Sequence, residues 1–436
     1  GACPFSHVFV HGLVRAGDGQ KMSKSLGNGV DPIEIIDQYG ADALRFMLIN
    51  GSAAGNDMRF TADKLESARN FANKLWNASR FTIMNLGDGG VREVKPVSAY
   101  EAGLEPVDLW MLKKTRDAAA DITRNLEAFD LSVATQKIYE LIWNEYCDWY
   151  IEFAKLRLAG EDEGAKAVAR SVLVSVLSDL LRLLHPFMPF ITEEIWSFLG
   201  KDGKLICDRW VDFGGGDLGA AAVDGGGAGS SAGVGVGSDA GSSAGVGVGS
   251  GGGGGAVSGI SAQSAYECTE FVIAVIRAVR NIRAEAGAGQ SRRLSLVAKI
   301  PLASGTGGQR QVGGRDCGEV LGAFAGYIEK LAGVKSVQCV TDGGEVPAEA
   351  MSAIVDGVEL YIPLDDLLDY AAERERLAKE KDRLEGNIAR LSAKLSNEGF
   401  TAKAPEHIVG AEREKLAAEQ DAYEKTLARI EAIQGK

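Results

Sequence analysis

The stretch "GQKMSKSLGNGVDPIEIIDQYG", residues 19–40, places a lysine loop directly before the start of a helix. Lys21 and Lys24 stand among glycines and serines with no apolar period, which predicts a loop. Their ammonium groups are compact charges on flexible stems. Such cations suit a polyanion whose negative charge grows during a reaction, such as the pyrophosphate that leaves a nucleotide. A solvated surface turn is the alternative that the two lysines alone leave open.

Signals on either side of this loop predict one strand and two helices. Residues 6–14, "SHVFVHGLV", are short and β-prone, so we expect a buried strand and then a turn at "RAGDG". After the loop, Asp31 is a good N-cap, Pro32 suits the first helical position, and Gly40 ends a short helix. The stretch "ADALRFML", residues 41–48, begins a second helix.

Residues 61–212 have the pattern of a helical domain. Apolar residues recur at helical spacing, and a polar, glycine-rich break spans residues 87–105. Thr192 is expected to cap a last short helix. Long helices joined by short breaks predict an α-helical bundle. Core packing is expected for its tryptophans at helix faces, which are Trp76, Trp143, Trp149 and Trp196. The main helices are expected at 61–86, 109–126, 138–153 and 168–184.

Residues 213–259 differ in composition from the rest of the chain. Gly, Ser, Ala and Val dominate, and "SSAGVGVGS" occurs at 230–238 and again at 242–250. So few large side chains cannot bury enough apolar surface to offset the entropy of ordering. We therefore expect a disordered linker.

Two further parts follow this tract. Residues 260–364 predict a small α+β unit, with an amphipathic helix in "AYECTEFVIAVIRAVRNIRAEAG" and strands at "LSLVAKI", "VKSVQCV" and "AIVDGVELYIPL". Residues 365–436 are charged and heptad-like, with Leu377, Leu384 and Leu391 spaced by seven. A second heptad series follows a break that contains Gly and Pro. This pattern predicts an antiparallel coiled-coil hairpin.

Length, charge and cysteine usage set limits on the class of protein. A chain of 436 residues exceeds one ordinary core, so two to four domains are expected. The net charge of −13 argues against indiscriminate nucleic-acid binding but permits a local basic patch. The six cysteines are scattered without a CxxC pair, which suits a reducing cytosol and shows no zinc or disulfide framework. We expect a cytoplasmic protein without a membrane span, because no long apolar run occurs.

The full string "KMSKS" at 21–25, after a β-prone segment and before a capped helix, resembles the signature of class I aminoacyl-tRNA synthetases. It is identical at all five signature positions. The stretches "DPIEIIDQYGADALRFML" and "FANKLWNASRF" resemble the stem-contact fold and first bundle helix of the valine, isoleucine and leucine subgroup. The stretch "KLSNEGFTAKAPEHIV" resembles the C-terminal arm of the bacterial valine enzymes. The resemblance covers almost the whole chain apart from the Gly/Ser/Ala/Val tract.

The resemblance implies a valine–tRNA ligase, which activates L-valine with ATP to valyl-adenylate and transfers valine to tRNA(Val). It implies that residues 1–60 form the end of a Rossmann-like α/β catalytic domain and that residues 61–212 bind the anticodon. Residues 365–436 would then form a tRNA-binding arm. ATP would bring Mg as its counter-ion, and a monomer is expected. The HIGH signature of the family is absent from these 436 residues, so we expect a fragment that is inactive alone.

The resemblance also assigns candidate site residues. Lys24, and next Lys21, would contact the ATP phosphates during the reaction. Ser23 and Ser25 would donate to phosphates or shape the loop, and Met22 would pack beside the adenine. One or two aromatic side chains would suit stacking on a splayed anticodon base, without the sequence singling any out.

Four arginines are candidate tRNA contacts, and no metal site is visible. For Arg45, the alternative is an ion pair on the surface of its helix. For the three arginines at residues 277–283, the alternative is a solvated stripe on one helix face. These arginines are Arg45, Arg277, Arg280 and Arg283.

Two other interpretations remain open at this level. One is a stand-alone tRNA-binding or scaffold protein with a relic lysine loop. The other is a fragment of an isoleucine or leucine enzyme. The isoleucine enzymes typically end in a Cys-rich zinc module and the leucine enzymes usually lack a long terminal hairpin, so the heptad arms favour valine.

Overall fold

The structure, a computed structural model, groups the chain into two compact units. Unit 1 comprises Gly1–Ala274 and Ala303–Leu331, and unit 2 comprises Val275–Leu302 and Ala332–Lys436. This grouping differs from the predicted boundaries near 260 and 364, which stay predictions. The predicted linker at 213–259 lies outside the described residues, apart from Phe213. The structure describes residues 3–51, 55–87, 89–211, 213, 260–289, 291–302, 309–341, 343–367, 370–397 and 406–434.

The first segment of unit 1 is extended and largely exposed. The strand β1 is only Val14–Arg15, and it pairs in parallel with β2, Met58–Arg59. Val8 is 83% exposed. The prediction of a buried strand over residues 6–14 is therefore wrong, because a pair of two-residue strands is too short to cover the segment on either face.

The two helices after the lysine loop form as predicted. Helix α1 is Pro32–Tyr39, and the Asp31 carboxylate accepts a hydrogen bond from the Ile33 N–H at 2.9 Å. Gly40 adopts φ 89°, a left-handed conformation that glycine tolerates, and its N–H donates to the Ile36 carbonyl. Helix α2, Ala41–Asn50, follows at once.

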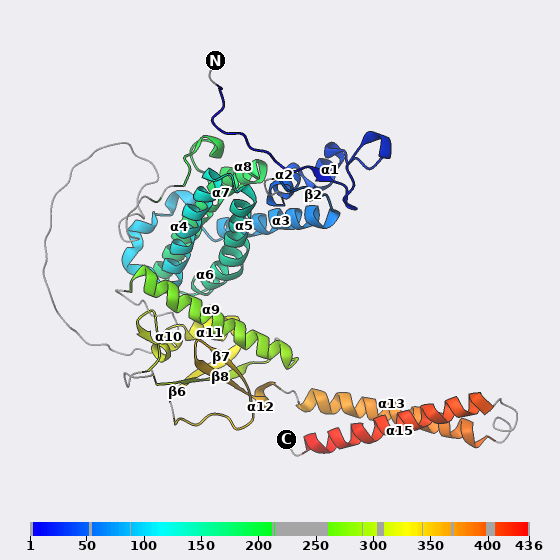
Figure 1. The fold of residues 1–436 in the computed structure, drawn as a ribbon. Coiled ribbons are helices and arrows are strands. Elements are labelled where there is room, and N and C mark those ends of the chain that lie inside the picture. The colour runs from blue at the N-terminus through cyan, green and yellow to red at the C-terminus, as the bar shows by residue number, and fades with distance from the viewer. Residues whose placement is uncertain are drawn as a thin grey trace, which may run out of the picture. The chain divides into compact units, whose positions relative to one another are not determined.

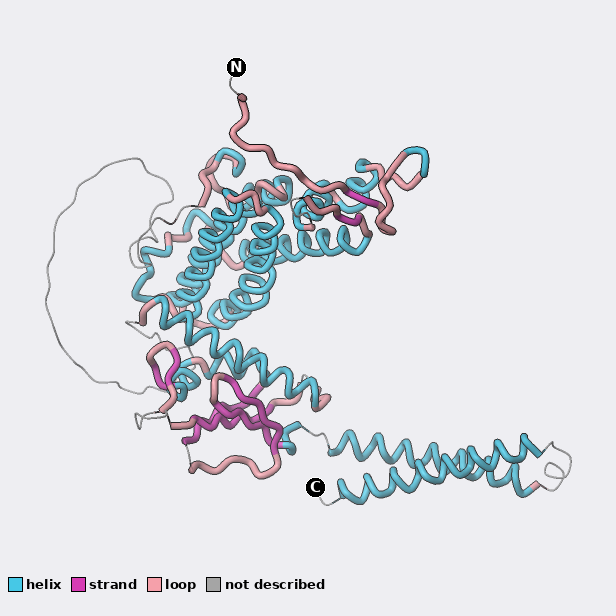
Figure 2. The backbone as a smooth tube through the Cα atoms, in the orientation of Figure 1, coloured by secondary structure: helices cyan, strands magenta, loops and turns pink. Residues whose placement is uncertain are grey.

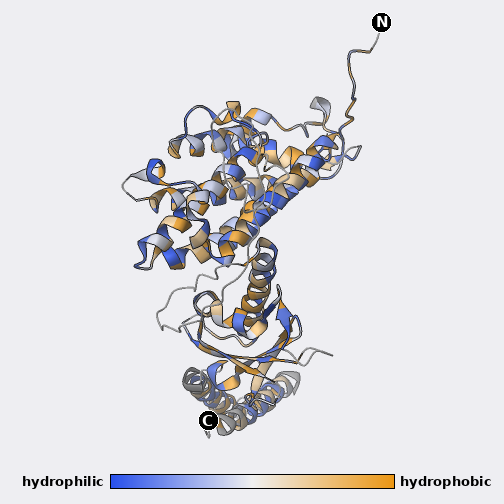
Figure 3. Ribbon diagram, turned by 90° about the vertical axis from the view of Figure 1, so that its left-hand side faces the viewer, coloured by the Kyte–Doolittle hydropathy of each residue, from blue (hydrophilic) through white to orange (hydrophobic). Residues whose placement is uncertain are grey.

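Helices α3 to α8 form the bundle of unit 1 (Figures 1 and 2). Helix α4 packs against α5 and α7, and α3 packs against α2 and α8. Figure 3 shows hydrophobic and hydrophilic residues on the same helices, as expected for helices with one buried face. The bundle elements are α3 (Ala62–Met84), η2 (Gly90–Glu93), η3 (Val97–Gly103), α4 (Pro106–Glu127), α5 (Leu131–Glu140), η4 (Leu141–Tyr150), α6 (Ile151–Leu158), α7 (Glu163–Leu184), α8 (Pro189–Phe198) and η5 (Leu205–Cys207).

Two local predictions for the bundle need correction. The helix expected at 138–153 is part of a longer helical run over 131–158, whose middle, η4, is π-helical. Thr192 does not cap α8, because the helix begins at Pro189. The Thr192 hydroxyl instead donates to the Met188 carbonyl at 2.8 Å inside the first turn.

The tryptophans of the bundle are only partly in the core. Trp149 and Trp196 are buried, at 4% and 3% exposure, as predicted. Trp143 is half-buried. Trp76 is 38% exposed, so its prediction as a core residue is wrong. Its position on α3 lies beside the buried stripe of Leu75 rather than on it.

A buried charged network fixes the start of α4. Asp108 is fully buried and accepts two hydrogen bonds from the Arg157 guanidinium, at 2.7 and 2.5 Å. The Tyr150 hydroxyl donates to the same carboxylate at 2.7 Å. Glu105 lies 3.9 Å from the Arg157 Nε and accepts a hydrogen bond from the Tyr327 hydroxyl. Burial raises the pKa of Glu105 above its ordinary value, and Arg157 partly opposes that rise.

Tyr327 brings a distant part of the sequence into unit 1. The segment around it contains a small β-hairpin. Two helices follow, α10 (Cys317–Ala323) and α11 (Ala325–Ala332). The hairpin joins β4 (Gln311–Val312) to β5 (Arg315–Asp316) through two glycines with positive φ. The Tyr327 ring also meets the Phe153 ring edge-on at 5.2 Å.

Unit 2 contains the expected strands. The sheet order is β6-β3-β8-β7, with β3 parallel to β6 and antiparallel to β8. Asp356 and Gly357 both have positive φ between β7 and β8, which is the conformation that a two-residue hairpin turn requires. The elements are β3 (Leu294–Ile300), β6 (Val334–Thr341), β7 (Ala350–Val355), β8 (Val358–Pro363) and α12 (Leu364–Leu367). Helix α9, Ala262–Glu285, contributes residues to both units.

The heptad arms form the predicted antiparallel hairpin. Helix α13, Tyr370–Ser396, packs along α15, Glu406–Gln434 (Figure 1). Leu377, Leu384 and Leu391 are all buried, as their spacing by seven predicts. The chain is thus mostly helical with a few small sheets, and this coarse fold class is confirmed.

Candidate functional site

The lysine loop starts from a tight turn. The Gly19 N–H donates to the Ala16 carbonyl at 2.8 Å, and Gly19 has φ 88°. Arg15 and Lys21 then face each other in an antiparallel bridge. The turn therefore returns the chain to β1, and Lys21 follows it as an exposed residue.

Asn28 holds the two ends of the loop together. Its side-chain oxygen accepts a hydrogen bond from the Ser23 N–H at 2.9 Å. Its side-chain nitrogen donates to the Lys21 carbonyl at 3.3 Å. One amide group thus fixes the backbone on both sides of Met22, which is half-buried. Sequence reasoning missed Asn28, although an asparagine beside Gly27 is a common signal of a side chain that bonds its own loop.

The serines of the loop bond to each other and to the backbone. The Ser23 hydroxyl accepts a hydrogen bond from the Leu26 N–H at 3.3 Å and lies 3.2 Å from the Ser25 hydroxyl. Ser23 therefore shapes the start of η1, Lys24–Leu26. Lys24 is the first residue of that turn, and its side chain lies outside the described residues. The structure brings residues 21–25 together in one short loop.

Arg45 joins α2 to the turn between α7 and α8. Its guanidinium donates to the carbonyls of Phe187 at 3.3 Å and Pro186 at 3.1 Å. One helical turn earlier, the Asp42 carboxylate accepts hydrogen bonds from the first N–H groups of α8, including that of Ile191 at 2.7 Å. Burial raises the pKa of Asp42, against these hydrogen bonds. Arg45 remains exposed, and its contact with tRNA stays a prediction.

The three arginines of α9 do not share one environment. Arg277 and Arg280 are exposed, whereas Arg283 is only 9% exposed. The Arg283 guanidinium donates to the carbonyls of Gly289 at 3.1 Å and Gly333 at 2.7 Å. Six residues turn a helix by about 600°, so Arg283 points about 120° away from Arg277. A phosphate would reach Arg283 only by displacing these carbonyls, while Arg277 and Arg280 stay open predictions.

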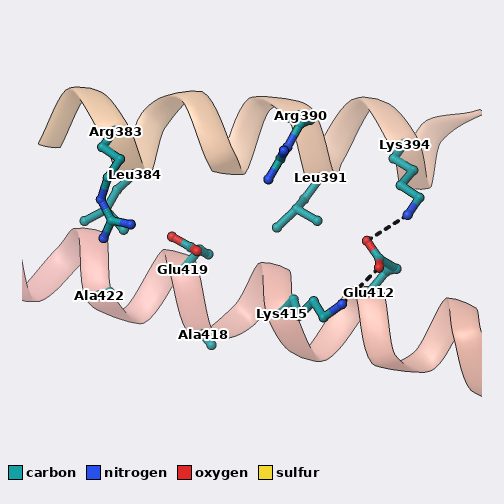
Figure 4. A pocket seen from close by; sticks show the side chains of 10 residues that line it. All are labelled: Arg383, Leu384, Arg390, Leu391, Lys394, Glu412, Lys415, Ala418, Glu419 and Ala422. Atoms are coloured by element: carbon teal, nitrogen blue, oxygen red, sulfur yellow. Dashed lines mark hydrogen bonds and ion pairs between the residues drawn. The ribbon is translucent and has the colours of Figure 1, made fainter. Parts of the chain in front are cut away.

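The hairpin carries a mixed-charge groove of about 610 Å³ between α13 and α15 (Figure 4). Glu412 pairs with Lys394 and with Lys415, each at 3.2 Å. Figure 4 shows Arg390 extending from α13 toward α15. The Glu419 carboxylate accepts a hydrogen bond from Asn387 at 3.2 Å, and its other oxygen is buried without a hydrogen bond to any described residue. Some of the cationic side chains that line the groove are therefore already paired with a carboxylate.

Neither a cluster of metal ligands nor a helix able to span a membrane occurs in the described parts of the chain. There, no three His, Cys, Asp or Glu side chains lie together in a way that would hold a metal ion. No helix in these parts combines the length and the apolar character needed to cross a bilayer.

Three parts of the sequence match known protein families. Residues 1–61 match the family of class I tRNA synthetases for I, L, M and V. Residues 108–221 match the anticodon-binding domain of tRNA ligases. Residues 369–434 match the tRNA-binding arm of valyl tRNA synthetases.

Curated relatives match almost the whole chain. The valine–tRNA ligase of Clostridium acetobutylicum is 40% identical over 412 residues, which is 94% of this chain and 40% of that protein. The valine–tRNA ligase of Bacillus cereus strain ATCC 10987 is 39% identical over 411 residues, with the same coverage. That of Geobacillus stearothermophilus is 38% identical over 409 residues. The chain spans about 40% of the length of these relatives.

Proposed function

We propose that this chain, a homologue of the valine–tRNA ligases over 94% of its length, supplies the lysine loop and the tRNA-binding parts of a valine–tRNA ligase. The reaction is the ATP-dependent activation of L-valine and its transfer to tRNA(Val). The observation that supports this proposal most is that one chain matches both a class I synthetase segment and the valyl arm. The arm favours valine over isoleucine and leucine.

Within this proposal, each part has its own task. Residues 1–60 end a Rossmann-like catalytic domain, 61–212 bind the anticodon, and 365–436 contact the body of the tRNA. ATP, with Mg as its counter-ion, and L-valine are the small substrates. The proposal includes a monomeric, cytoplasmic enzyme.

Lys24 and Lys21 are the proposed contacts to the phosphates of ATP. The support is geometric for Lys21, which is exposed at the end of the turn that begins at Arg15. Asn28 supports the role of both lysines indirectly, because its two hydrogen bonds fix the backbone that carries them. Fixed cations stabilise charge that develops in the transition state without reorganising at the moment of reaction.

A chimeric enzyme tests this function. The chain replaces the matching part of the Clostridium acetobutylicum ligase, and valine-dependent exchange of pyrophosphate into ATP is measured. We expect exchange with the chimera and none with the chain alone. In the chimera, Lys24→Ala should lower kcat for exchange about a hundredfold with little change in KM for valine.

The control for this experiment is Lys425→Ala, which removes an exposed lysine of the hairpin. It should leave the exchange rate unchanged. A chimera that folds but charges tRNA(Ile) or tRNA(Leu) in preference to tRNA(Val) would contradict the proposed specificity. A Lys24→Ala rate within about threefold of the parent would contradict the proposed role of Lys24.

A further inference from the structure

Three cationic residues stand in a row at the base of the lysine loop. Arg15 of β1 is the register partner of Arg59 of β2, and it also faces Lys21 in an antiparallel bridge. Residues directly opposite on neighbouring strands carry their side chains on the same face, with about 5 Å between the strands. Like charges placed in this way repel each other. The row therefore destabilises the fold unless anions lie nearby.

Arg15 is the one member of this row with a carboxylate partner among the described residues. The Asp57 carboxylate accepts hydrogen bonds from the Arg15 Nε and, at 2.8 Å, from the Leu13 N–H. The Leu13 bond, and after it the Arg15 bond, lower the pKa of Asp57, so this carboxylate stays charged at neutral pH. Lys21 and Arg59 make no ion pair within the part of the chain that the structure describes. Two of the three positive charges are therefore left without a carboxylate there.

The Arg59 guanidinium packs against the turn that leads into the loop. Gly19 has φ 88°, and a Cβ built on it would lie 3.3 Å from the Arg59 Nε and 3.4 Å from a terminal nitrogen. In addition, the Lys64 ammonium donates to the Arg59 carbonyl at 3.2 Å and adds a further cation. Both Arg59 and Lys21 are exposed. An anion can therefore reach the row from solvent without displacing a bond of either side chain to a described residue.

We propose that Arg59, with Arg15 and Lys21, forms a site for a diphosphate group, either free pyrophosphate or the terminal phosphates of a nucleotide. This inference rests on the proposed function, which places ATP at the lysine loop, and it adds Arg59 as a contact. A guanidinium binds two phosphate oxygens at once through its paired N–H donors, whereas an ammonium acts as a point charge. Cations in a row suit linked phosphates better than a single phosphate. Lys21 belongs both to the row and to the loop, so one ligand reaches both.

Binding to the complete 436-residue chain at low salt tests the inference. The probes are inorganic pyrophosphate, ATP, AMP and a labelled tRNA(Val) transcript. Their Kd values are measured by titration calorimetry, and by fluorescence anisotropy for the RNA. Arg59→Ala should weaken the binding of pyrophosphate and of ATP about tenfold, because charge-assisted hydrogen bonds are lost. AMP has a single phosphate and should bind weakly to parent and variant alike, and the Kd for tRNA(Val) should not change.

Arg124→Ala is the matched control, because the Arg124 side chain is 69% exposed on α4 and lies outside the row. It should leave the Kd of every probe unchanged. Arg59→Lys keeps the charge but loses the paired donors, so its Kd for pyrophosphate should lie between those of the parent and of Arg59→Ala. Pyrophosphate should also raise the melting temperature of the parent more than that of Arg59→Ala, because only the parent binds it well.

The outcomes separate this inference from the proposed function. Equal pyrophosphate affinity of the parent and Arg59→Ala, or no pyrophosphate binding by the parent, would overturn the diphosphate site, while binding of tRNA(Val) would leave the proposed function intact. An equal loss of AMP and pyrophosphate binding would overturn it too, because a contact to one phosphate would explain that loss. A loss of tRNA binding alone in Arg59→Ala would overturn it and assign the row to RNA. Failure of the parent chain to bind tRNA(Val) would instead contradict the proposed function.

Discussion

Asp108 and Arg157 show how single buried charges hold the bundle. The Arg157 side chain is 6% exposed and the Asp108 side chain 0%. Two charges at this depth are stable only as a pair, because each alone would lack the hydration that it lost on folding. Glu105 and Tyr327 extend the network, in which the Tyr327 hydroxyl donates to the Glu105 carboxylate and the Arg157 Nε lies 3.9 Å from it.

Removing one partner of this pair should strongly destabilise unit 1. Arg157→Met leaves a buried carboxylate unpaired, and we expect a loss of about 3–5 kcal/mol in the free energy of unfolding. Urea unfolding followed by tryptophan fluorescence measures it, because all six tryptophans lie in unit 1. The double variant Asp108→Leu/Arg157→Met should recover much of the loss.

The control is Arg124→Met, which removes an arginine that is 69% exposed and pairs with Asp121. Exposed pairs contribute little, so its effect should stay below about 1 kcal/mol. If Arg157→Met were no more harmful than Arg124→Met, the network would not carry the stability assigned to it.

Asp179 should make the stability of unit 1 depend on pH. Burial raises the pKa of Asp179 from 3.8 to about 6, with Arg182 opposing the rise. Below pH 3.8, the ordinary pKa of the group, the carboxyl is protonated in both the folded and the unfolded chain. Its contribution to stability is then complete. As pH rises to about 6, the unfolded chain gives up this proton more readily than the folded one, so stability falls.

Asp179→Asn should remove this part of the pH dependence. Melting temperatures of the parent and the variant between pH 4 and pH 7 should therefore diverge through the window set by the shift from 3.8 to about 6. Asp202→Asn, a change at an exposed carboxylate of the same unit, should follow the parent curve. Parallel curves for all three proteins would show that Asp179 ionises in the folded state at its ordinary pKa.

Single residues were also where the sequence was least informative. Trp76 and Arg283 each lie one helical position away from the environment that spacing predicted. Sequence spacing predicts the edge of a buried stripe only to within about one residue. One residue turns a helix by about 100°, which is enough to move a side chain from the core to the surface. The exposure of these two side chains therefore depends on which neighbouring helix or loop packs against them. The local sequence pattern does not predict that packing.

At the scale of elements, the sequence predicted those features that depend on residues close together in the chain. Asp31, Pro32 and Gly40 set both ends of α1, and the heptads set the hairpin. The π-helical η4 and the exposure of residues 6–14 depend on packing partners instead. A strand is buried only if other strands flank it, and β1 has two residues of β2 beside it.

The hairpin should contribute tRNA affinity without affecting valine activation. A version of the chimera that ends at Leu364 lacks the arm, and we expect a higher KM for tRNA(Val) and a flatter salt dependence of binding, because phosphate contacts are lost. The rate of exchange of pyrophosphate into ATP should not change. The measurements are tRNA binding across a salt series and the exchange assay on the same protein.

Two results would contradict that role of the arm. Unchanged tRNA affinity at every salt concentration would leave the hairpin as a structural element only. A loss of exchange activity would mean that it supports the catalytic part. Leu384→Ala, which removes a buried leucine of the hairpin, offers a milder variant that should shift tRNA affinity in the same direction.

At the scale of the whole molecule, composition distinguishes the tract at 213–259 from the rest of the chain, but it does not predict the grouping into units. Contact grouping places Ala303–Leu331, which lies within the predicted α+β unit, in unit 1. Hydrophobic patterning shows that α11 has a buried face, but it does not show which core receives that face. Tyr327 and Phe153 illustrate the point, since 174 residues separate two rings that touch (327 minus 153).

Removal of residues 214–259 should leave folding and tRNA binding nearly unchanged. The tract has few large apolar side chains, and the entropy of closing a loop changes slowly with its length. A short Gly/Ser linker in its place should give the melting temperature of the parent and a Kd for tRNA(Val) within about twofold. Loss of soluble protein, or a tenfold loss of affinity, would contradict the interpretation as a linker.

The bond between Glu105 and Tyr327 spans 222 residues of sequence, and this separation matters while the chain is being made. At about 5–20 residues per second, a ribosome needs roughly 10–45 s to synthesise the residues between them. During that interval the Glu105 carboxylate and the Arg157 guanidinium have emerged, but the tyrosine that completes their network does not yet exist. The helical bundle therefore lacks the Tyr327 hydroxyl at Glu105 until a segment far downstream has been made. Translation speed across residues 157–327 thus sets how long Glu105 and Phe153 lack their contacts with Tyr327.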